Sequence, residues 1–419
     1  MKIAIVGTGI AGLTAAHKLN DQHELTLFEA NHYVGGHANT IDVQEGDRTI
    51  PIDTGFIVLN DWTYPHFQAL LETIDVDIYN SDMSFSVRCE SNNFEWCGDG
   101  INGLVLNRDN WKKLSAYKML IEILSFNRLA NNTVEKNHTI HSQQSLGEFL
   151  VRNRFSRAFV DYYILPMGAA IWSASTEDMN NYPAISFLRF FKNHGLLSVR
   201  NQPQWKTIVG GARAYVEKLS MPFKDKILLN TAVKKITRQH NQVTLHTQDG
   251  QSYDFDHVFL ACHSDQALQC LASPTELESI TLGAIKYQKN VATLHTDDSI
   301  MPQRKKAWSS WNYLIGQGED KMSKVSYYMN RLQNLATNKD YFVSLNMQER
   351  LDENKICRSI DYMHPVFDKA AIDAQANFTE LNGTHNTWYC GAYWRNGFHE
   401  DGVWSSLEAV EFFKQASNA

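Results

Sequence analysis

A glycine-rich turn and a later acidic residue form the first group of residues with a recognisable chemical use. Gly7, Gly9 and Gly12 follow the apolar segment 2–6 in the spacing G-x-G-x-x-G, and Glu29 ends the next apolar segment. The first glycine permits a tight turn, the second lets a pyrophosphate approach the backbone, and the third lets a helix pack closely against a strand. An acid at position 29 accepts bonds from ribose hydroxyls and disfavours a 2′-phosphate, hence NADP. The predicted dinucleotide-binding residues are Gly7, Gly9, Ile10, Ala11, Gly12, Glu29 and Ala30.

The elements that must position these residues are a strand, a helix and a second strand. Residues 2–7 form a short apolar run, residues 10–20 have helical spacing, and residues 24–29 form a second apolar run. Such a β-α-β unit brings a phosphate to the start of the helix, where amide groups are free. Further along the chain, residues 111–195 are rich in helical patterns and residues 226–262 in strand patterns.

Two glycines shortly after Glu29 extend the pattern. Gly35 and Gly36 begin the string GGHANT, and the string IPIDTGF ends at Phe56. This arrangement resembles the flavin-containing amine oxidase superfamily, which includes protoporphyrinogen oxidases and carotenoid desaturases, and in which many members have arginine where His37 stands here. The resemblance implies an FAD cofactor that lies along Gly35, Gly36, His37, Thr54, Gly55 and Phe56.

The last segment of the chain carries the second part of the resemblance. TWYCGAYWRNGFHEDGVWSSLEAVEFF resembles the terminal flavin motif of the superfamily. This implies that Gly391 lets the chain pass the ribityl group and that Gly402 and Val403 open a helix that faces the flavin. Partial positive charge at a helix start stabilises a nearby anion. LNTAVKKI resembles the strand that pairs with adenine, which implies a backbone contact from Val233.

A closer resemblance covers nearly the whole chain. Strings such as LPMGAAIWSAS, VFLACHSDQAL and CGAYWRNGFHEDGV are similar to a bacterial family of FAD/NAD-binding oxidoreductases and to the flavin domain of some plant cyclopropane fatty-acid synthases. Bacterial members are commonly encoded beside cyclopropane-synthase-like methyltransferases. The resemblance implies chemistry on an unsaturated or methylated fatty-acyl chain and an acyl-modifying methyltransferase as a partner.

The substrate pocket is expected to be apolar, with aromatic walls. The superfamily places groups near the flavin face at the positions of Phe398 and His399; a histidine can act as an acid or base near neutral pH, although a structural role is the common alternative. Amine oxidases usually carry a lysine near the flavin, and neither Lys286 nor Lys289 stands at the matching place, which argues against classical amine oxidation. The predicted substrate-contacting residues are Trp172, Trp311, Tyr393, Trp394 and Phe398.

Together these patterns predict an α/β fold: a Rossmann-type FAD-binding domain with an inserted α+β substrate domain, like that of amine oxidases and protoporphyrinogen oxidases. Because a strand-loop-helix pattern returns late in the sequence, we expect the FAD-binding domain to be discontinuous. It would comprise 1–62, 205–285 and 385–419, and the substrate domain would comprise 63–204 and 286–384.

The composition argues against several other classes of protein. The chain has 419 residues and a formal net charge of −7, so nothing indicates the basic face that nucleic acid requires. The six cysteines lack metal-ligand spacing, and no metal site is expected. No apolar run reaches the roughly 18–20 residues that cross a bilayer, and we expect a cytoplasmic protein. Residues 111–130 predict an amphipathic helix, which either packs between domains or rests on the inner membrane as a peripheral contact.

The expected function is that of an FAD-dependent oxidoreductase. Its substrate would be an apolar small molecule or lipid that exchanges a hydride with flavin N5. Two alternatives stay open: an amine oxidase that releases peroxide, and a flavin-bound accessory subunit of an acyl-modifying methyltransferase.

Overall fold

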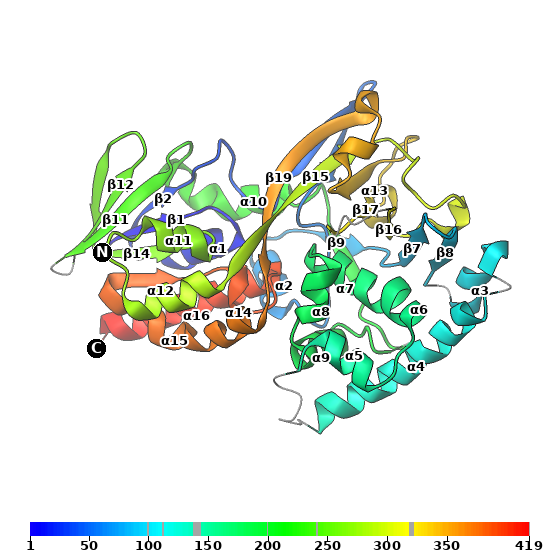
Figure 1. Cartoon of the computed structure of the whole chain (residues 1–419). Helices are drawn as coiled ribbons and strands as arrows, with labels where there is room; N and C mark the ends of the chain where they lie inside the picture. The colour runs from blue at the N-terminus through cyan, green and yellow to red at the C-terminus, as the bar shows by residue number, and fades with distance from the viewer. Residues whose placement is uncertain are drawn as a thin grey trace.

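The first two predicted strands lie side by side in a five-stranded parallel sheet (Figure 1), with the order β10-β2-β1-β14-β20. The computed structural model describes residues 1–98, 100–110, 113–136, 144–198, 200–239, 242–317 and 322–418. The strands are β1 (Lys2–Val6), β2 (Glu24–Phe28), β10 (Ile227–Leu228), β14 (His257–Leu260) and β20 (Thr387–Tyr389). Ile3, Ala4 and Ile5 are fully buried, as expected for a parallel strand that is covered on both faces.

Helices pack against this sheet and connect its strands. α1 (Ile10–Leu19) follows β1 and packs against the last helix, α16 (His399–Asn418). In Figure 1, α12 (Glu276–Ala284), α15 (Phe378–Leu381) and α16 lie together below the sheet. The other helices of this region are α10 (Arg213–Ser220), α11 (Ser264–Cys270) and α14 (Lys369–Ala374).

A small antiparallel sheet lies between β10 and β14 in the sequence. It consists of β11 (Val233–Gln239), β12 (Gln242–Thr247) and β13 (Ser252–Phe255). The turn between β12 and β13 contains Gly250, whose φ of +87° suits glycine.

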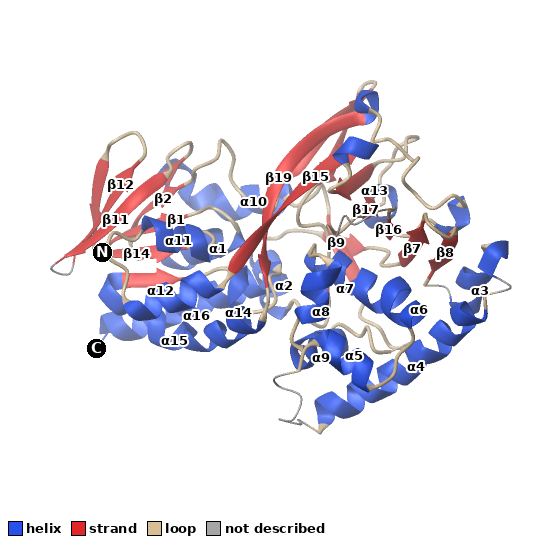
Figure 2. Ribbon diagram, viewed as in Figure 1, coloured by secondary structure: helices blue, strands red, loops and turns tan. Residues whose placement is uncertain are grey.

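A seven-stranded sheet forms the second large layer, in the order β19-β15-β18-β17-β16-β7-β8. Its strands are β7 (Phe85–Cys89), β8 (Phe94–Cys97), β15 (Lys286–His295), β16 (Trp311–Ile315), β17 (Val325–Tyr328), β18 (Phe342–Leu345) and β19 (Ile356–Val366). β15 and β19 are antiparallel partners from Lys286 to His295, and Figure 2 shows these two long strands crossing the middle of the molecule.

A group of helices covers the lower right of the molecule in Figure 2. The group consists of α3 (Gly100–Val105), α4 (Leu114–Glu135), α5 (Leu146–Arg152), α6 (Arg157–Phe159), α7 (Leu165–Trp172), α8 (Thr176–Asn181) and α9 (Ala184–Asn193). α4 forms the outer edge of the group (Figure 1). It buries the stripe Ala116, Met119, Phe126 and Ala130, whose steps of three, seven and four residues keep these side chains on one face of a helix.

Two short sheets and a buried carboxyl group connect the two regions. The sheets are β3 (Thr40–Glu45) with β4 (Arg48–Asp53), and β5 (Leu59–Asn60) with β9 (Trp205–Ile208) and β6 (Ile78–Asn80). The carboxyl group of Asp53 accepts hydrogen bonds from Thr40 Oγ1 at 2.6 Å, from the Ala212 amide at 2.9 Å and from Gln333 Nε2 at 3.0 Å. Gln333 directly follows α13 (Met329–Leu332). Burial raises the pKa of Asp53 to about 7, although the bonds from Thr40 and Ala212 and the charge of Arg213 lower it in part.

The predicted Rossmann-type arrangement with an α+β region is confirmed, with one correction at the C-terminal helix. α16 begins at His399, not at Gly402. The reason is local, because the Asp401 carboxylate accepts the Phe398 amide at 2.9 Å and so closes the first helical turn earlier.

Two further observations bear on how the regions are divided. β19, the longest strand, was not predicted, and α2 (Pro65–Thr73) and α14 pack against α16 and α12, although both were assigned to the substrate domain. The domain boundaries themselves stay a prediction. Within the described residues, every helix is too short or too polar to cross a bilayer.

Candidate functional site

A cavity of about 1910 Å³ joins the glycine turn to the helical group around α4. Its wall contains residues of the parallel sheet, of the seven-stranded sheet and of the terminal loop 391–398. The predicted site residues that line it are Gly7, Gly9, Ile10, Ala11, Glu29, Ala30, Gly35, Gly36, His37, Thr54, Gly55, Phe56, Trp172, Val233, Trp311, Gly391, Tyr393, Phe398 and His399. The cavity therefore brings most of the predicted cofactor and substrate residues together.

The glycine turn has one position that is open and two that are crowded. A Cβ at Gly7 would lie 2.9 Å from the Ala261 carbonyl oxygen, and a Cβ at Gly12 would lie 2.0 Å from the Gly7 carbonyl oxygen. A Cβ at Gly9 would meet no atom within 4 Å. Gly9 is also the N-cap of α1, which has no side-chain cap and no acid in its first turn. The first amides of α1 are thus available to an anion.

The carboxylate of Glu29 is held rigidly in the cavity wall. One oxygen accepts the Thr8 amide at 3.0 Å and the Thr8 hydroxyl at 2.6 Å. The other accepts the Asn31 amide at 2.8 Å and its side-chain nitrogen at 3.0 Å. A fixed negative charge therefore stands beside the glycine turn. The bond from Glu29 to a ribose stays a prediction.

The twin glycines pass directly over the glycine turn. The Gly35 amide donates to the Thr8 carbonyl at 3.0 Å, and a Cβ at Gly36 would lie 3.2 Å from Gly9 Cα. Both residues have positive φ, +122° and +58°, which glycine adopts without strain. The two backbones approach so closely that side chains at these glycines would fill the narrow space beside the turn. A ligand can therefore enter this space only because glycines line it.

His37 belongs to a cluster of rings on the cavity wall. Its ring stacks on Tyr362 at 4.8 Å and lies 5.4 Å from His364 and 6.0 Å from His263. Burial lowers the pKa of His37 and of His263 to about 4 and that of His364 to about 3. All three imidazoles are therefore neutral at physiological pH, and His37 does not supply the positive charge of an arginine.

The sequence did not indicate Tyr362 and His364, because both lie on the unpredicted strand β19. The hydroxyl of Tyr362 lies 3.0 Å from Thr54 Oγ1, which ties β19 to the predicted flavin segment. A local sequence pattern can indicate a strand, but it does not reveal which distant segment that strand faces.

The loop 391–398 is held in place from three sides. The Gly391 amide donates to Ser405 Oγ at 2.9 Å, and Trp172 Nε1 donates to the Asn396 carbonyl at 3.2 Å. The Asp401 carboxylate accepts the amides of Asn396 at 3.1 Å and Phe398 at 2.9 Å. Burial raises the pKa of Asp401 to about 7. The loop thus presents Tyr393 and Phe398 to the cavity, and His399, the first residue of α16, also lines it.

Four predicted site residues lie outside the cavity wall: Gly12, Trp394, Gly402 and Val403. Trp394 is 2% exposed and packs on Phe378 with a ring distance of 4.9 Å, away from the cavity wall, and its contact with a substrate stays a prediction. A Cβ at Gly402 would lie 2.8 Å from Ile10 Cγ2, and Val403 is 1% exposed within the core. Because α16 starts three residues early, Gly402 and Val403 lie inside its first turns and pack on α1 rather than opening the helix.

His399 is a buried and neutral imidazole. Its ring stacks on Phe56 at 3.7 Å, and its Nε2 lies 3.0 Å from the Tyr215 hydroxyl. Burial, together with nearby His37, lowers the pKa of His399 to about 3. The imidazolium form is therefore not available near neutral pH, and the acid–base role proposed for His399 stays a prediction.

The replacement His399→Gln is expected to leave the pH dependence of the reaction unchanged between about pH 5 and pH 8. A group whose folded pKa is about 3 does not titrate in this range. The test is the rate of anaerobic flavin reduction by a substrate, measured as a function of pH for both proteins. An ionisation in this range that the wild type has and the variant lacks would establish His399 as the titrating group instead.

The lysines of β15 point to solvent. Lys286 pairs with Asp368 at 3.4 Å and Lys289 with Asp361 at 2.7 Å, and both lysine side chains are more than half exposed. Neither residue lines the cavity. These positions agree with the expectation that neither lysine occupies the place it has in amine oxidases.

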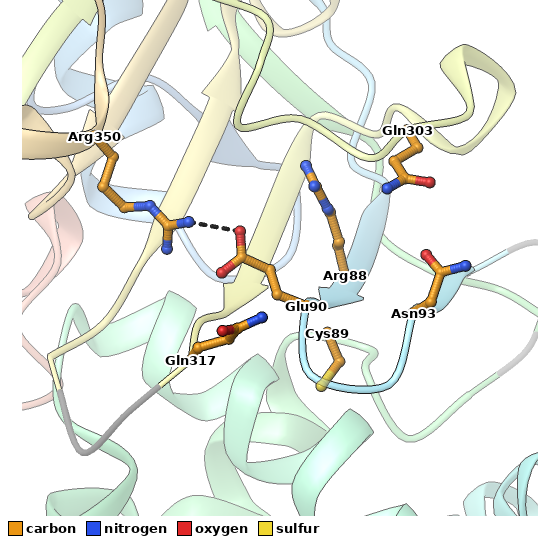
Figure 3. Close-up of a pocket in the computed structure, with 7 residues that line it drawn as sticks. All are labelled: Arg88, Cys89, Glu90, Asn93, Gln303, Gln317 and Arg350. Atoms are coloured by element: carbon orange, nitrogen blue, oxygen red, sulfur yellow. Dashed lines mark hydrogen bonds and ion pairs between the residues drawn. The ribbon is translucent and has the colours of Figure 1, made fainter.

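A second pocket is polar, and its charged side chains already have partners within the protein (Figure 3). It has a volume of about 490 Å³ and lies near β7 and β16. Arg350 pairs with Glu90, and Arg88 donates to the carbonyl oxygens of Ser299 and Met301. Its charged groups are therefore already used. Within the described residues no group of three or more possible ligands is placed to hold a metal ion.

The main cavity fits a dinucleotide with a flavin. The open space at Gly9, the uncapped start of α1 and the fixed carboxylate of Glu29 match the pyrophosphate and ribose of such a molecule. Further along the wall, four buried atoms lack a hydrogen-bond partner among the described residues: His37 Nε2, Asn127 Oδ1, Trp311 Nε1 and the Tyr393 hydroxyl. Buried polar atoms of this kind usually meet a ligand or water. The fold and cavity thus define a dinucleotide-binding protein of the Rossmann type.

Comparison with known proteins identifies the family. The family described as flavin containing amine oxidoreductase matches residues 10–330. The chain therefore belongs to this family of flavin-containing oxidoreductases, whose cofactor is FAD.

Individual relatives differ in what they act on. The protein named flavin-containing monoamine oxidase AofH from Mycobacterium tuberculosis is 26% identical over 262 residues, which are 60% of this chain and 54% of AofH. This chain thus matches about half the length of that relative. Wild-type putrescine oxidase bound to putrescine has a TM-score of 0.70 at 12% identity and 99% coverage of both chains. A CLA-producing fatty acid isomerase from P. acnes has a TM-score of 0.68 at 16% identity and 98% coverage of both chains. These structures establish a common fold.

Proposed function

We propose that this FAD-dependent oxidoreductase acts on a long apolar substrate, an unsaturated or methylated fatty-acyl chain. The observation that carries the proposal is the size and lining of the cavity. Its volume is about 1910 Å³, whereas pockets for one small molecule usually measure about 300–1,000 Å³. The cavity therefore has room for a second molecule beside the dinucleotide.

The part of the cavity away from the glycine turn is mainly apolar, although Lys306 and Arg331 also line it. Its wall includes Phe85, Trp96, Leu106, Leu120, Ile123, Tyr163, Met167, Ile171, Trp172, Phe190, Leu196, Trp308, Trp311 and Tyr327. Two acidic residues line the described cavity, Glu29 and Asp361. The Glu29 carboxylate is bonded to Thr8 and Asn31, and Asp361 is paired with Lys289. Such a wall favours hydrocarbon over a charged amine.

The residues of the chain bind and shield the substrate. When bound, the flavin supplies a hydride acceptor or donor at its N5 atom. Phe398 stacks against Phe190 at 5.2 Å, and Trp172 fixes the loop that carries Phe398. We infer that these aromatic side chains hold the acyl chain in one orientation and keep water away from the reacting carbon.

A second candidate is an amine oxidase that releases peroxide. The family and the named relatives favour it, and aromatic walls can also hold a cation through their ring faces. The positions of Lys286 and Lys289 on the solvent side weigh against it. A third candidate, a flavin-bound accessory subunit of an acyl-modifying methyltransferase, rests on the resemblance to cyclopropane-synthase flavin domains.

An anaerobic screen at the flavin absorbance band separates these candidates. Unsaturated or methylated phospholipids and free fatty acids are expected to bleach the flavin, and polyamines and aromatic amines are not. A reaction without net flavin reduction would not change the absorbance. The recovered lipid is therefore also analysed for new, lost or shifted double bonds. Bleaching by amines alone would replace the proposal with amine oxidation. Unchanged lipid and flavin, together with co-purification of a methyltransferase, would support the accessory subunit.

A further inference from the structure

Helices α3 and α4 carry large apolar side chains that stay exposed. We call these residues the α3–α4 face: Ile101 is 66% exposed, Leu114 84%, Ile121 66% and Leu124 57%. Large apolar side chains gathered on one surface mark an interaction site more often than single ones do.

α4 has two apolar stripes on opposite sides. The inner stripe, which includes Met119 and Phe126, is fully buried in the core. Leu114, Ile121 and Leu124, with half-buried Tyr117, follow the outer stripe at a spacing of three or four residues. A helix that only packs between domains needs one apolar stripe, so the outer stripe has no use in the core.

The outer stripe borders the mouth of the main cavity. Ile101, Ile121 and Leu124 line the cavity and are also more than half exposed. Tyr117 and Leu120 continue the apolar wall inward from them. An apolar ligand that enters here stays in contact with apolar side chains from the surface to the interior.

The charges around the face are mainly positive, although the whole chain has a net charge of −7. Of the charged side chains described between residues 100 and 135, Arg108, Lys113, Lys118 and Arg128 are basic and Glu122 and Glu135 are acidic. Glu135 is the last residue of α4 and pairs with Lys192 at 3.1 Å. Glu122 is 9% exposed and turns inward, where it accepts the amide and hydroxyl of Ser156. Apolar side chains framed by basic ones complement an anionic lipid surface.

We propose that the α3–α4 face docks on an anionic lipid bilayer and that an acyl chain passes from the bilayer into the cavity between these helices. The docking stands on the face itself, and the passage of the acyl chain rests on the function proposed above. In Figure 1, α4 forms the lower right edge of the molecule, away from the parallel sheet. This position leaves the cofactor end of the cavity away from the membrane.

Co-sedimentation of the FAD-loaded protein with vesicles tests the docking. The wild type is expected to bind vesicles that contain phosphatidylglycerol, more weakly at high salt, and to stay largely in solution with pure phosphatidylcholine. The triple variant Leu114→Ser/Ile121→Ser/Leu124→Ser is expected to lose binding by at least about tenfold. Lys118→Glu/Arg128→Glu is expected to weaken binding to the anionic vesicles specifically.

A matched variant controls for general surface effects. Val151→Ser/Met221→Ser/Ile280→Ser replaces three side chains that are 79%, 69% and 60% exposed on other helices and is expected to bind like the wild type. FAD content and melting temperature confirm that each variant is folded. Absence of wild-type binding, or equal loss in both triple variants, would overturn the proposal. So would a wild-type dimer that the α3–α4 variant converts to a monomer, because the face would then join two copies.

The two proposals fail in different ways. If docking is wrong but the function is right, detergent-solubilised acyl lipid reacts, and the protein does not bind to vesicles. If the function is wrong but docking is right, the protein binds anionic vesicles while the solubilised lipid leaves the flavin and its own double bonds unchanged.

Discussion

Replacing Gly9 by alanine is expected to leave the protein folded and to lower its affinity for FAD by about ten- to hundredfold. Gly9 has a φ of −68°, which alanine adopts freely, and its Cβ would meet no protein atom within 4 Å. The added methyl group would occupy the space where we expect the pyrophosphate. Overpacking costs about 1–3 kcal/mol, and each ~1.4 kcal/mol is tenfold in Kd. Titration of the apoprotein with FAD, followed by flavin fluorescence, measures the change.

The matched control is Gly12→Ala, which is expected to destabilise the fold of the apoprotein itself. Its Cβ would lie 2.0 Å from the Gly7 carbonyl oxygen and 3.3 Å from Ala261 Cβ. The clash is within the protein, so the apoprotein itself should melt at a lower temperature. A Gly9→Ala protein with the wild-type Kd for FAD would show that the pyrophosphate does not lie over this turn.

The second large effect, on the free energy of unfolding, is expected at the buried ion pair between Arg238 and Glu278. Arg238 of β11 donates two hydrogen bonds to the carboxylate of Glu278, and the Tyr389 hydroxyl donates a third. Glu278 is fully buried. Arg238→Leu would leave this carboxylate without its cation, and removing one partner of a buried pair costs about 3–5 kcal/mol. Urea unfolding at neutral pH is expected to report a free energy of unfolding lower by this amount.

The double variant Arg238→Leu/Glu278→Leu is the control, because it removes both charges and is expected to recover much of the loss. The pair also predicts a dependence on pH. Burial alone would raise the pKa of Glu278, but the bonds from Arg238 and Tyr389 lower it from 4.5 to about 2. This stabilisation is present above pH 4.5 and is lost as the pH falls toward 2. Equal stability of the single and double variants would contradict this account.

The cofactor half of the site was predictable because its signals are local. Gly7, Gly9 and Gly12 are set by the turn between one strand and one helix, and Glu29 lies at the end of the strand beside it. Each of these requirements acts within a few residues of the chain and therefore leaves a fixed spacing. The presence of FAD followed from that spacing and from the family resemblance.

The substrate half was less predictable because it depends on contacts between distant segments. Tyr393 and Trp394 are neighbours in sequence, yet Tyr393 lines the cavity and Trp394 packs on Phe378. The sequence identifies both as aromatic and does not tell which one faces inward. In the same way, Tyr362 and His364 face the cavity only because β19 pairs with β15.

The order of strands in the parallel sheet has a consequence for how the protein is made. β1 carries the glycine turn at the start of the chain, but β20 and α16, which complete that region, come after every other strand. During synthesis on the ribosome the glycine turn is therefore made well before β20 and α16. We expect stable capture of the flavin only after α16 has been made, and until then the edge of β14 that pairs with β20 lacks its partner.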